Sequence, residues 1–477
     1  MIRISQLKLP VSHSREDLEK KIEKTLGVSL ARTESWRIVR RSVDARKKDQ
    51  LLYIYSIDVK AAGEEKLVRR TRNRNVELVQ EQIYRFPKSG DGELSAPPVI
   101  VGEGPAGLFC GLMLARAGYR PLILERGEPV EERERKVQAF WEGGPLDPDS
   151  NVQFGEGGAG TFSDGKLNTL VKDKSGRNGL VLSILAEFGA DPSITYEAKP
   201  HIGTDVLGKI VTSMRREIIR MGGEVRFRSQ VTDLSVEGGQ VTGVVLRSGE
   251  RIPAQAVVLA VGHSARDTFR MLLERKVPME AKAFAVGLRI QHPQDMIDLS
   301  QYGPGGGEIL GAASYKLTHQ TPGGRGVYSF CMCPGGYVVN ASSEPGRLAV
   351  NGMSYHDRAG ENANSALIVT VTPEDFRAFA DRDRERDPLA GIAFQRELEA
   401  RAFRLGGGRI PVQLWGDFSR DGISQGLGEV RPAFKGEWAF GNLREILPGY
   451  MSASLAEAME AFGHMIKGFD RPDAVLA

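Results

Sequence analysis

Residues 98–127, PVIVGEGPAGLFCGLMLARAGYRPLILERG, decide the fold of this chain. An apolar run is followed by glycines in GxGxxG spacing, a helix-forming segment and a second apolar run. Gly102 permits a tight turn, Gly104 permits close approach of a pyrophosphate, and Gly107 lets the helix pack on the sheet. Glu125, at the end of the second run, is placed to accept hydrogen bonds from an adenosine ribose. This order predicts a dinucleotide-binding βαβ unit.

A second Gly-rich segment indicates which dinucleotide is bound. Residues 150–167, SNVQFGEGGAGTFSDGKL, are too polar for a core strand and suit close approach of the backbone to a flat ring system. Residues 222–262 then predict a small meander, which begins with a strand over 224–231 and returns to the parallel sheet through a buried strand. Dehydrogenases that use NAD alone rarely combine these features, so the pattern favours FAD.

With these segments in view, the chain resembles a bacterial family of FAD-dependent dehydrogenases within the glutathione-reductase-like flavoproteins. The resemblance spans nearly the whole chain. The matching words are VGEGPAGLF, LERG, NVQFGEGGAGTFSDGKL, PHIGTD (200–205), LAVGHSARDTF (259–269), FCMCPGG (330–336), NGMS (351–354) and ANSA (363–366).

The resemblance implies an α/β fold with a Rossmann-like FAD-binding domain, an inserted strand-rich substrate domain and a small N-terminal α/β domain, for which a ferredoxin-like fold is a candidate. The residues expected to bind FAD are Gly102, Gly104, Pro105, Ala106, Gly107, Glu125, Arg126, Gly157, Gly158, Gly160 and Gly262. Glu103 departs from the family, which favours small residues there. The family pattern also implies a further "GEGAGYAGG"-like segment beyond Ala477, closing the FAD domain.

The chain divides into four predicted regions. They are a basic α/β accessory domain at 1–92, the first part of the FAD-binding domain at 97–278, the substrate domain at 279–430 and a return to the FAD domain at 431–477. In the first, Leu18, Ile22 and Leu26 recur at helical spacing. In the last, Ser454 and Glu457 have capping-box spacing.

Composition excludes several classes of protein. The 477 residues are 41% hydrophobic, enough for large cores. No apolar run approaches the roughly 20 residues of a membrane helix, and the first residues lack the apolar centre of a signal peptide. With only three cysteines, the sequence predicts a cytoplasmic protein without a disulfide framework.

The cysteines leave one question open. Cys331 and Cys333 would share a face if they lie in a regular strand, so a redox pair near the flavin is conceivable. We favour packing, because cysteine behaves as a small hydrophobe. No Cys/His cluster predicts a metal site.

Positive charge is concentrated near the N-terminus. Residues 1–95 hold 21 Lys or Arg against 14 Asp or Glu, although the whole chain carries a formal charge of only +3. Arg69, Arg70, Arg72 and Arg74 could contact nucleic-acid phosphates. We favour a solvated charged face instead, because acidic residues are interspersed and no stacking aromatic motif is present.

Few residues are candidates for catalysis. Lys166 lies in the second Gly-rich segment, where a cation would stabilise reduced flavin. His263 and His201 are candidate proton shuttles, with structural roles as the alternative. Arg289 and His292 are candidates for recognising an anionic substrate.

The sequence therefore predicts an FAD-dependent oxidoreductase that transfers a hydride between flavin and an unidentified small organic substrate. No second GxGxxG has the full strand and acid context, so NAD(P)H would be only a transient electron donor. One alternative is an NAD(P)H-dependent flavin monooxygenase. Another is a flavin-poor, truncated protein whose N-terminal domain binds nucleic acid or protein.

Overall fold

The computed structural model describes residues 1–477 apart from 168, 170 and 382–386. Its Cα positions group into two compact units. The first unit comprises Met1–Lys88, Lys166–Ile202 and Asp298–Ala313, and the second comprises Ser89–Gly165, Gly203–Ile297 and Ser314–Ala477. Each unit is thus assembled from segments far apart in sequence, and the four domain limits drawn from the sequence stay predictions.

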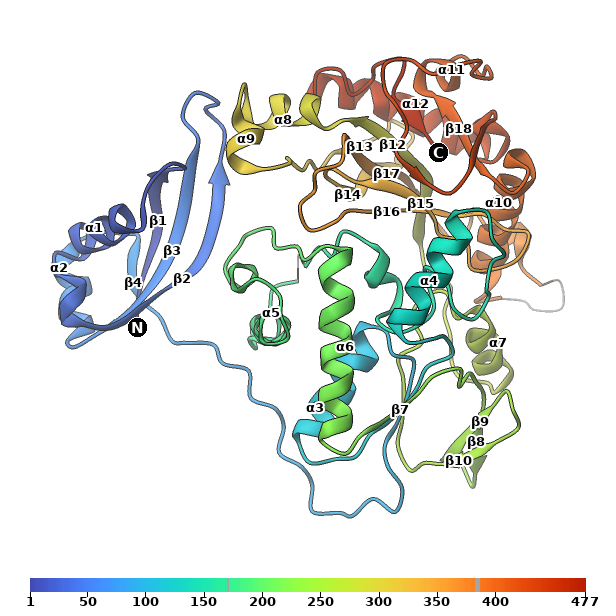
Figure 1. The fold of residues 1–477 in the computed structure, drawn as a ribbon, viewed down its shortest axis with the longest axis horizontal. Coiled ribbons are helices and arrows are strands. Elements are labelled where there is room, and N and C mark those ends of the chain that lie inside the picture. The colour runs from blue at the N-terminus through green and yellow to red at the C-terminus, as the bar shows by residue number, and fades with distance from the viewer. Residues whose placement is uncertain (168, 170, 382–386) are drawn as a thin grey trace. The chain divides into compact units, whose positions relative to one another are not determined.

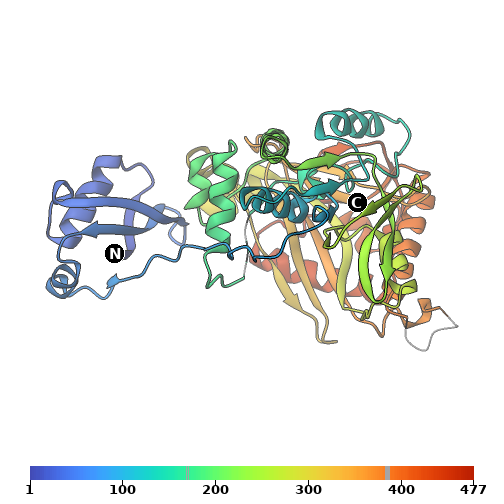
Figure 2. The same ribbon diagram turned by 90° about the horizontal axis from the view of Figure 1, so that it is seen from below.

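The first unit contains an antiparallel sheet with two helices on one face (Figures 1 and 2). Its elements are β1 (Ile2–Pro10), α1 (Arg15–Leu26), η1 (Leu30–Arg32), β2 (Thr33–Asp44), β3 (Leu52–Ala61), α2 (Glu64–Thr71) and β4 (Val76–Leu78), followed later by α5 (Arg177–Glu187), η3 (Pro192–Thr195) and α9 (Gly306–Leu310). The strand order β2-β3-β1-β4 with βαββαβ connectivity is a ferredoxin-like arrangement.

Helix α1 forms where the sequence predicts it. Ser14 caps its first turn in a capping box, and Gly27 ends it with φ 66°, in the left-handed region. Leu18, Ile22 and Leu26 are all buried and belong to the core that the helix shares with the sheet. The apolar face predicted from their spacing is confirmed.

The second unit begins with the predicted βαβ unit, which is confirmed as β5, α3 and β6. A parallel sheet has the order β11-β5-β6-β7, and beside it a three-stranded antiparallel sheet has the order β10-β9-β8. The elements are β5 (Val99–Val101), α3 (Pro105–Arg116), β6 (Leu122–Leu124), α4 (Val130–Trp141), η2 (Gly158–Phe162), α6 (Thr204–Arg220), β7 (Glu224–Arg226), β8 (Val231–Glu237), β9 (Gln240–Leu246), β10 (Arg251–Pro253), β11 (Val257–Leu259) and α7 (Arg266–Glu274).

The rest of the second unit is built on two further sheets. One has seven strands in the order β13-β14-β17-β12-β21-β18-β20, and the other has the order β16-β15-β19. The elements are β12 (Phe284–Pro293), α8 (Gln294–Tyr302, which continues into the first unit), β13 (Thr318–Gln320), β14 (Gly326–Cys333), β15 (Tyr337–Asn340), β16 (Val350–Met353), β17 (Asn362–Val371), η4 (Arg377–Phe379), α10 (Ala390–Gly406), β18 (Ile410–Leu414), α11 (Trp415–Ser419), β19 (Phe434–Lys435), β20 (Trp438–Phe440), η5 (Leu443–Glu445), α12 (Gly449–Met465) and β21 (Val475–Leu476).

The end of the chain completes the seven-stranded sheet. Strand β21 pairs with β12, Ile290 opposite Leu476, and with β18. The short apolar run at 474–477 is buried between those two strands. Its strand therefore belongs to the seven-stranded sheet.

Two local predictions were wrong. Ser454 and Glu457 do not form a capping box, because α12 already begins at Gly449. The Ser454 hydroxyl donates to the Tyr450 carbonyl at 2.8 Å. Residues 224–231 do not form one strand, because Arg228 has φ 53° and breaks it.

Candidate functional site

Steric constraints require two glycines in the turn after β5. Gly102 has φ 97°, and a Cβ there would lie 2.6 Å from the Ala260 carbonyl oxygen. A Cβ at Gly107 would lie 1.9 Å from the Gly102 carbonyl oxygen. Only glycine therefore allows α3 to pack this closely on the sheet.

Gly104 differs from these two because space lies in front of it. A Cβ there would meet only the Gly158 Cα, at 3.9 Å. Gly104 is the N-cap of α3, and among the described residues no side chain caps this helix, whose first turn holds Pro105 and Ala106. Its first amides carry the positive end of the helix dipole. The positive helix end and the open space in front of Gly104 therefore suit the pyrophosphate of a dinucleotide.

The second Gly-rich segment packs against this turn. The Gly157 amide donates to the Glu103 carbonyl at 2.9 Å. A Cβ at Gly158 would lie 3.1 Å from the Gly104 Cα, and Gly158 has φ 62°. Gly160 follows in η2, where a Cβ would meet only Pro105, at 3.9 Å. The two loops thus form one backbone cradle.

Glu125, at the end of β6, joins the loops. Its carboxylate accepts from the amides of Glu103 at 2.8 Å, Gly127 at 2.9 Å and Gly155 at 3.1 Å. Two of these bonds fall on Oε1 and one on Oε2, so Oε2 can still accept a donor such as a ribose hydroxyl. The ribose contact stays a prediction, and the loop bonds were missed by the sequence analysis.

Arg133 of α4 is a structural residue that the sequence analysis missed. Its guanidinium is fully buried and donates to the carbonyls of Asn151 at 2.8 Å, Val152 at 3.0 Å and Glu156 at 2.6 Å. Desolvation lowers its pKa to about 10. A Cβ at Gly155 would lie 2.4 Å from the Arg133 Cδ, so this glycine is required as well. Arg133 fixes the loop that carries Gly157 and Gly158.

Two buried carboxyls lie under the cradle. Glu103 is fully buried, and neither of its carboxyl oxygens has a hydrogen-bond partner in the described part of the chain. Burial, followed by the charges of Glu156 and Glu125, raises the pKa of Glu103 well above its usual value. Glu156 accepts from the Val130 amide at 2.7 Å and pairs with Arg215 at 2.9 Å, while burial raises its pKa to about 6.

A small cavity of about 30 Å³ opens at the carboxyl ends of β5 and β6, where ligands bind in open α/β sheets. Gly102, Glu125 and Arg126 line it. The Arg126 guanidinium lies 4.4 Å from the centre of the Phe154 ring and pairs with Asp267 at 2.9 Å. This is the region expected for the adenosine half of the cofactor.

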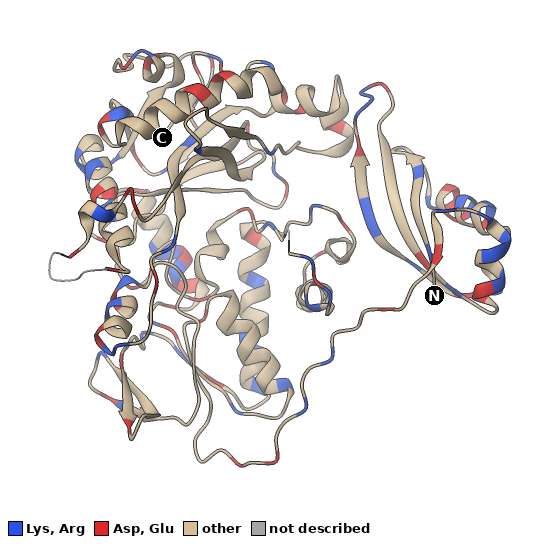
Figure 3. Ribbon diagram, turned by 180° about the vertical axis from the view of Figure 1, so that it is seen from behind, with Lys and Arg blue, Asp and Glu red and all other residues tan. Residues whose placement is uncertain are grey.

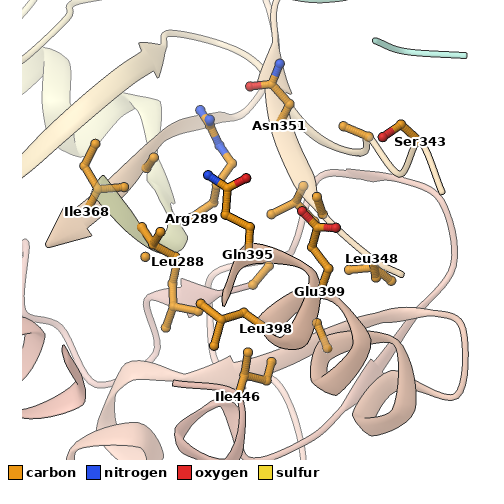
Figure 4. Close-up of a pocket in the computed structure, with 18 of the residues that line it drawn as sticks. Leu288, Arg289, Ser343, Leu348, Asn351, Ile368, Gln395, Leu398, Glu399 and Ile446 are labelled. Atoms are coloured by element: carbon orange, nitrogen blue, oxygen red, sulfur yellow. The ribbon is translucent and has the colours of Figure 1, made fainter. Parts of the chain in front are cut away.

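A larger cavity of about 410 Å³ lies between the β12–β17 sheet, strand β16 and helix α10 (Figure 4). Apolar residues dominate one side of it, including Leu288, Leu398 and Ile446. Arg289 and Asn351 lie on the other side. A polar end and an apolar body are typical of a site for a small organic molecule.

His263 lines this larger cavity. It follows Gly262, whose φ of 73° turns the chain at the end of β11. The His263 Nδ1 lies 3.2 Å from the Ser264 Oγ, which contacts the Gln153 side chain. Desolvation and the charge of Arg266 lower the pKa of His263, so the ring is neutral near pH 7.

The other candidate residues lie elsewhere. Lys166 and His201 form an antiparallel bridge within the first unit, and their catalytic roles stay predictions. His292 is fully buried, with Nε2 2.6 Å from the Phe469 carbonyl oxygen, and desolvation lowers its pKa to about 4. Recognition of an anion by His292 is therefore wrong, because its ring is enclosed in the core.

The two cysteines of FCMCPGG do not lie in a regular strand. Cys331 has φ 45°, and the register of β14 against β17 shifts between Phe330 and Cys333. The bulge breaks the alternation that would place both thiols on one face. Cys333 is buried and lies 3.7 Å from the Arg289 Nη2.

The described residues hold neither a candidate metal site nor a candidate membrane-spanning helix. Outside 168, 170 and 382–386, no group of three or more His, Cys, Asp or Glu side chains is arranged to hold a metal ion. Within the same ranges, no helix has the length and apolar character needed to cross a membrane.

Solved structures that match part of the chain are distant. Thermovibrio ammonificans THI4 is 20% identical with a TM-score of 0.27, over 39% of this chain and 66% of that chain. The glycerol-3-phosphate dehydrogenase from Bacillus halodurans complexed with FAD is 11% identical with a TM-score of 0.28, over 58% of this chain and 47% of that chain. This chain spans less than two thirds of either length, and neither reaction can be transferred to it.

Sequence comparison is more informative. Residues 283–477 match a family described as "FAD-dependent protein, C-terminal domain-like", and residues 1–60 match a domain of unknown function, DUF8436. An uncharacterised protein of Clostridium beijerinckii is 47% identical over 479 residues, which cover 100% of this chain and 88% of that protein. The chain therefore belongs to the same family as this clostridial protein, with a C-terminal region of the FAD-dependent type.

Proposed function

We propose that this chain is an FAD-dependent oxidoreductase that transfers a hydride between the flavin and a small organic substrate. The observation that carries the proposal is the open N-terminus of α3, where Gly104 and Gly158 leave room for a pyrophosphate. The match of residues 283–477 to FAD-dependent proteins supports the same cofactor.

Each part of the site has a proposed role. Gly102, Gly104 and Gly107 would hold the pyrophosphate with the first turn of α3, while Glu125 and Arg126 would bind the adenosine side. The loop of Gly157, Gly158 and Gly160, with Gly262, would lie near the flavin. Bound FAD would supply the capacity to accept or donate a hydride.

The large cavity would hold the substrate. Of the two candidate proton shuttles, His263 lines this cavity. A neutral imidazole can accept or return the proton that accompanies hydride transfer. We infer a cytoplasmic enzyme with NAD(P)H as a transient electron donor, and we expect the "GEGAGYAGG"-like segment in other members of the family.

The test is the visible absorption spectrum of the purified protein, with the flavin identified after denaturation. We expect FAD at one per chain, or uptake of added FAD by colourless protein. Gly104→Ala should weaken FAD binding about tenfold, because the added methyl occupies the space at the helix end. The control is Gly449→Ala, where a Cβ would meet nothing within 4 Å.

Protein that stays colourless in excess FAD would overturn the proposal. RNA binding by that colourless protein would then favour the flavin-poor alternative. Equal FAD affinity in wild-type and Gly104→Ala protein would show that the cofactor does not use the α3 terminus.

A further inference from the structure

The large cavity contains a buried cation held by neutral partners. Arg289 of β12 is 3% exposed and lines the cavity. Its Nε and Nη2 donate to the Asn364 Oδ1 at 3.0 and 2.7 Å, and Nη2 also donates to the Cys331 carbonyl at 2.8 Å. These acceptors are uncharged, and no described carboxylate side chain forms an ion pair with this guanidinium.

Donor groups at this place remain unused. Nη1 of Arg289 makes no hydrogen bond to a described residue. The Nδ2 of Asn364, a fully buried residue, likewise has no partner within the described ranges. A buried charge is costly unless it is paired, and an unmade buried hydrogen bond adds to that cost. The arrangement lacks an anionic acceptor.

The guanidinium also lies against the backbone of β16. A Cβ at Gly352 of β16 would lie 2.1 Å from the Arg289 Nη2 and 2.6 Å from the Asn364 Oδ1. Gly352 must therefore be glycine for the arginine to lie across β16. The contact gives a role to two motifs that FAD binding does not explain. Gly352 belongs to NGMS, and Asn364 belongs to ANSA.

The surroundings indicate what kind of anion fits. Asn351 and Gln395 lie on the same side of the cavity as Arg289, and Leu398 and Ile446 lie on the opposite side (Figure 4). Glu399, an acidic side chain of the lining, already pairs with Arg266, so it does not neutralise Arg289. The volume of about 410 Å³ suits a small molecule with one charged end.

We propose that the cavity binds a small monocarboxylate with an apolar body, its carboxylate paired with the Arg289 guanidinium. The pairing supplies the missing acceptor, and a planar guanidinium matches a carboxylate in shape. As an identification of the substrate class, this inference rests on the proposed function. As a statement about binding, it can be tested without turnover.

The experiment is calorimetric titration of the full chain, with and without FAD, using phenylacetate and hexanoate as probes. Their amides, phenylacetamide and hexanamide, are the neutral controls. We expect at least one acid to bind at least about tenfold more tightly than its amide. Arg289→Met should remove this preference.

A second pair of variants covers the case in which Arg289→Met does not fold. Ala366 of β17 lies opposite Arg289 and lines the cavity, so a side chain there reaches the same space. Ala366→Asp supplies an internal carboxylate that can pair with Arg289. It should weaken binding of the acids at least about tenfold, which corresponds to about 1.4 kcal/mol. Ala366→Asn has nearly the same size and should retain the preference for acids.

The outcomes separate this inference from the proposed function. A protein that binds FAD but binds neither acid more tightly than its amide overturns the inference alone. A colourless protein that binds the acids through Arg289 overturns the proposed function and supports the carboxylate site. Equal acid binding by Ala366→Asp and Ala366→Asn would place the acids away from Arg289 and overturn the inference.

Discussion

Arg133 and Glu103 are both fully buried beside the cofactor cradle, yet their charges have opposite surroundings. The Arg133 guanidinium donates to loop carbonyls on every side. The Glu103 carboxyl has no hydrogen-bond partner among the described residues and lies near two other acids. The arginine is therefore stable as an ion, whereas the glutamate is stable only when protonated.

This difference predicts that Glu103→Gln stabilises the folded protein by an amount that depends on pH. Folding raises the pKa of Glu103, so the folded state favours its protonated form. The stability of the wild type therefore falls as the pH rises from the pKa of Glu103 in the unfolded state toward its pKa in the folded state. Glutamine carries no charge. Its stability advantage over the wild type should therefore grow as the pH rises and level off above the raised pKa of Glu103.

Urea denaturation of both proteins at several pH values upward from the ordinary glutamate pKa of about 4.3 measures the effect. Glu93→Gln, at an exposed position, is the control and should leave stability unchanged. Parallel pH profiles for wild type and Glu103→Gln would show that Glu103 is not held protonated.

At the scale of single elements, the sequence predicted those whose own pattern determines them. Helix α1 follows from the spacing of Leu18 and Leu26 and from the glycine at its end. The βαβ unit follows from its glycines. In each case local residues supply both the apolar face and the signals that end the element.

Elements that depend on distant partners could not be predicted in the same way. Arg133 lies in a charged run, VEERERKV, and its burial comes from the loop that folds over it. Strand β21 has two residues, too few for a periodic signal, and forms because β12 and β18 leave a gap. Ser454 and Glu457 matched a capping box because the same spacing also occurs inside helices.

The contact between α4 and its loop predicts a large effect for Arg133→Leu. Leucine would leave the carbonyls of Asn151, Val152 and Glu156 without their donor. We expect a loss of about 2–4 kcal/mol of stability and weaker FAD binding, because the loop carries Gly157. Denaturation and FAD titration measure both.

The matched control is Arg135→Leu, an exposed arginine on the same helix whose guanidinium reaches only the Glu131 carbonyl. It should cost less than about 0.5 kcal/mol. Equal losses in the two variants would mean that charge on α4, and not the buried hydrogen bonds, stabilises the loop.

At the scale of the whole molecule, the excess of positive charge in residues 1–95 is spread among acids. Figure 3 shows Lys and Arg interleaved with Asp and Glu over α1 and α2. Arg70 donates to the Gly27 carbonyl at 2.9 Å, at the end of α1. Lys60 pairs with Glu34. A nucleic-acid phosphate would have to displace these neighbours to bind Arg70 or Lys60.

We therefore predict that the full chain binds single-stranded RNA no more tightly than about 10⁻⁴ M at physiological salt. Fluorescence anisotropy of a labelled RNA at two salt concentrations tests this. Tight binding that weakens with salt, and that Arg69→Glu and Arg72→Glu reduce, would contradict the prediction and identify a nucleic-acid site.

The pairing of β12 with β21 also delays completion of the seven-stranded sheet while the chain is being synthesised. Ile290 meets its partner Leu476 only after the residues between them have been synthesised. At a synthesis rate of about 5–20 residues per second, β12 waits roughly 10 to 40 s with one side open. During that interval its hydrogen-bonding edge is exposed to other nascent chains. The yield of folded protein in a cell should therefore depend on how well this incomplete sheet is shielded until β21 has been synthesised.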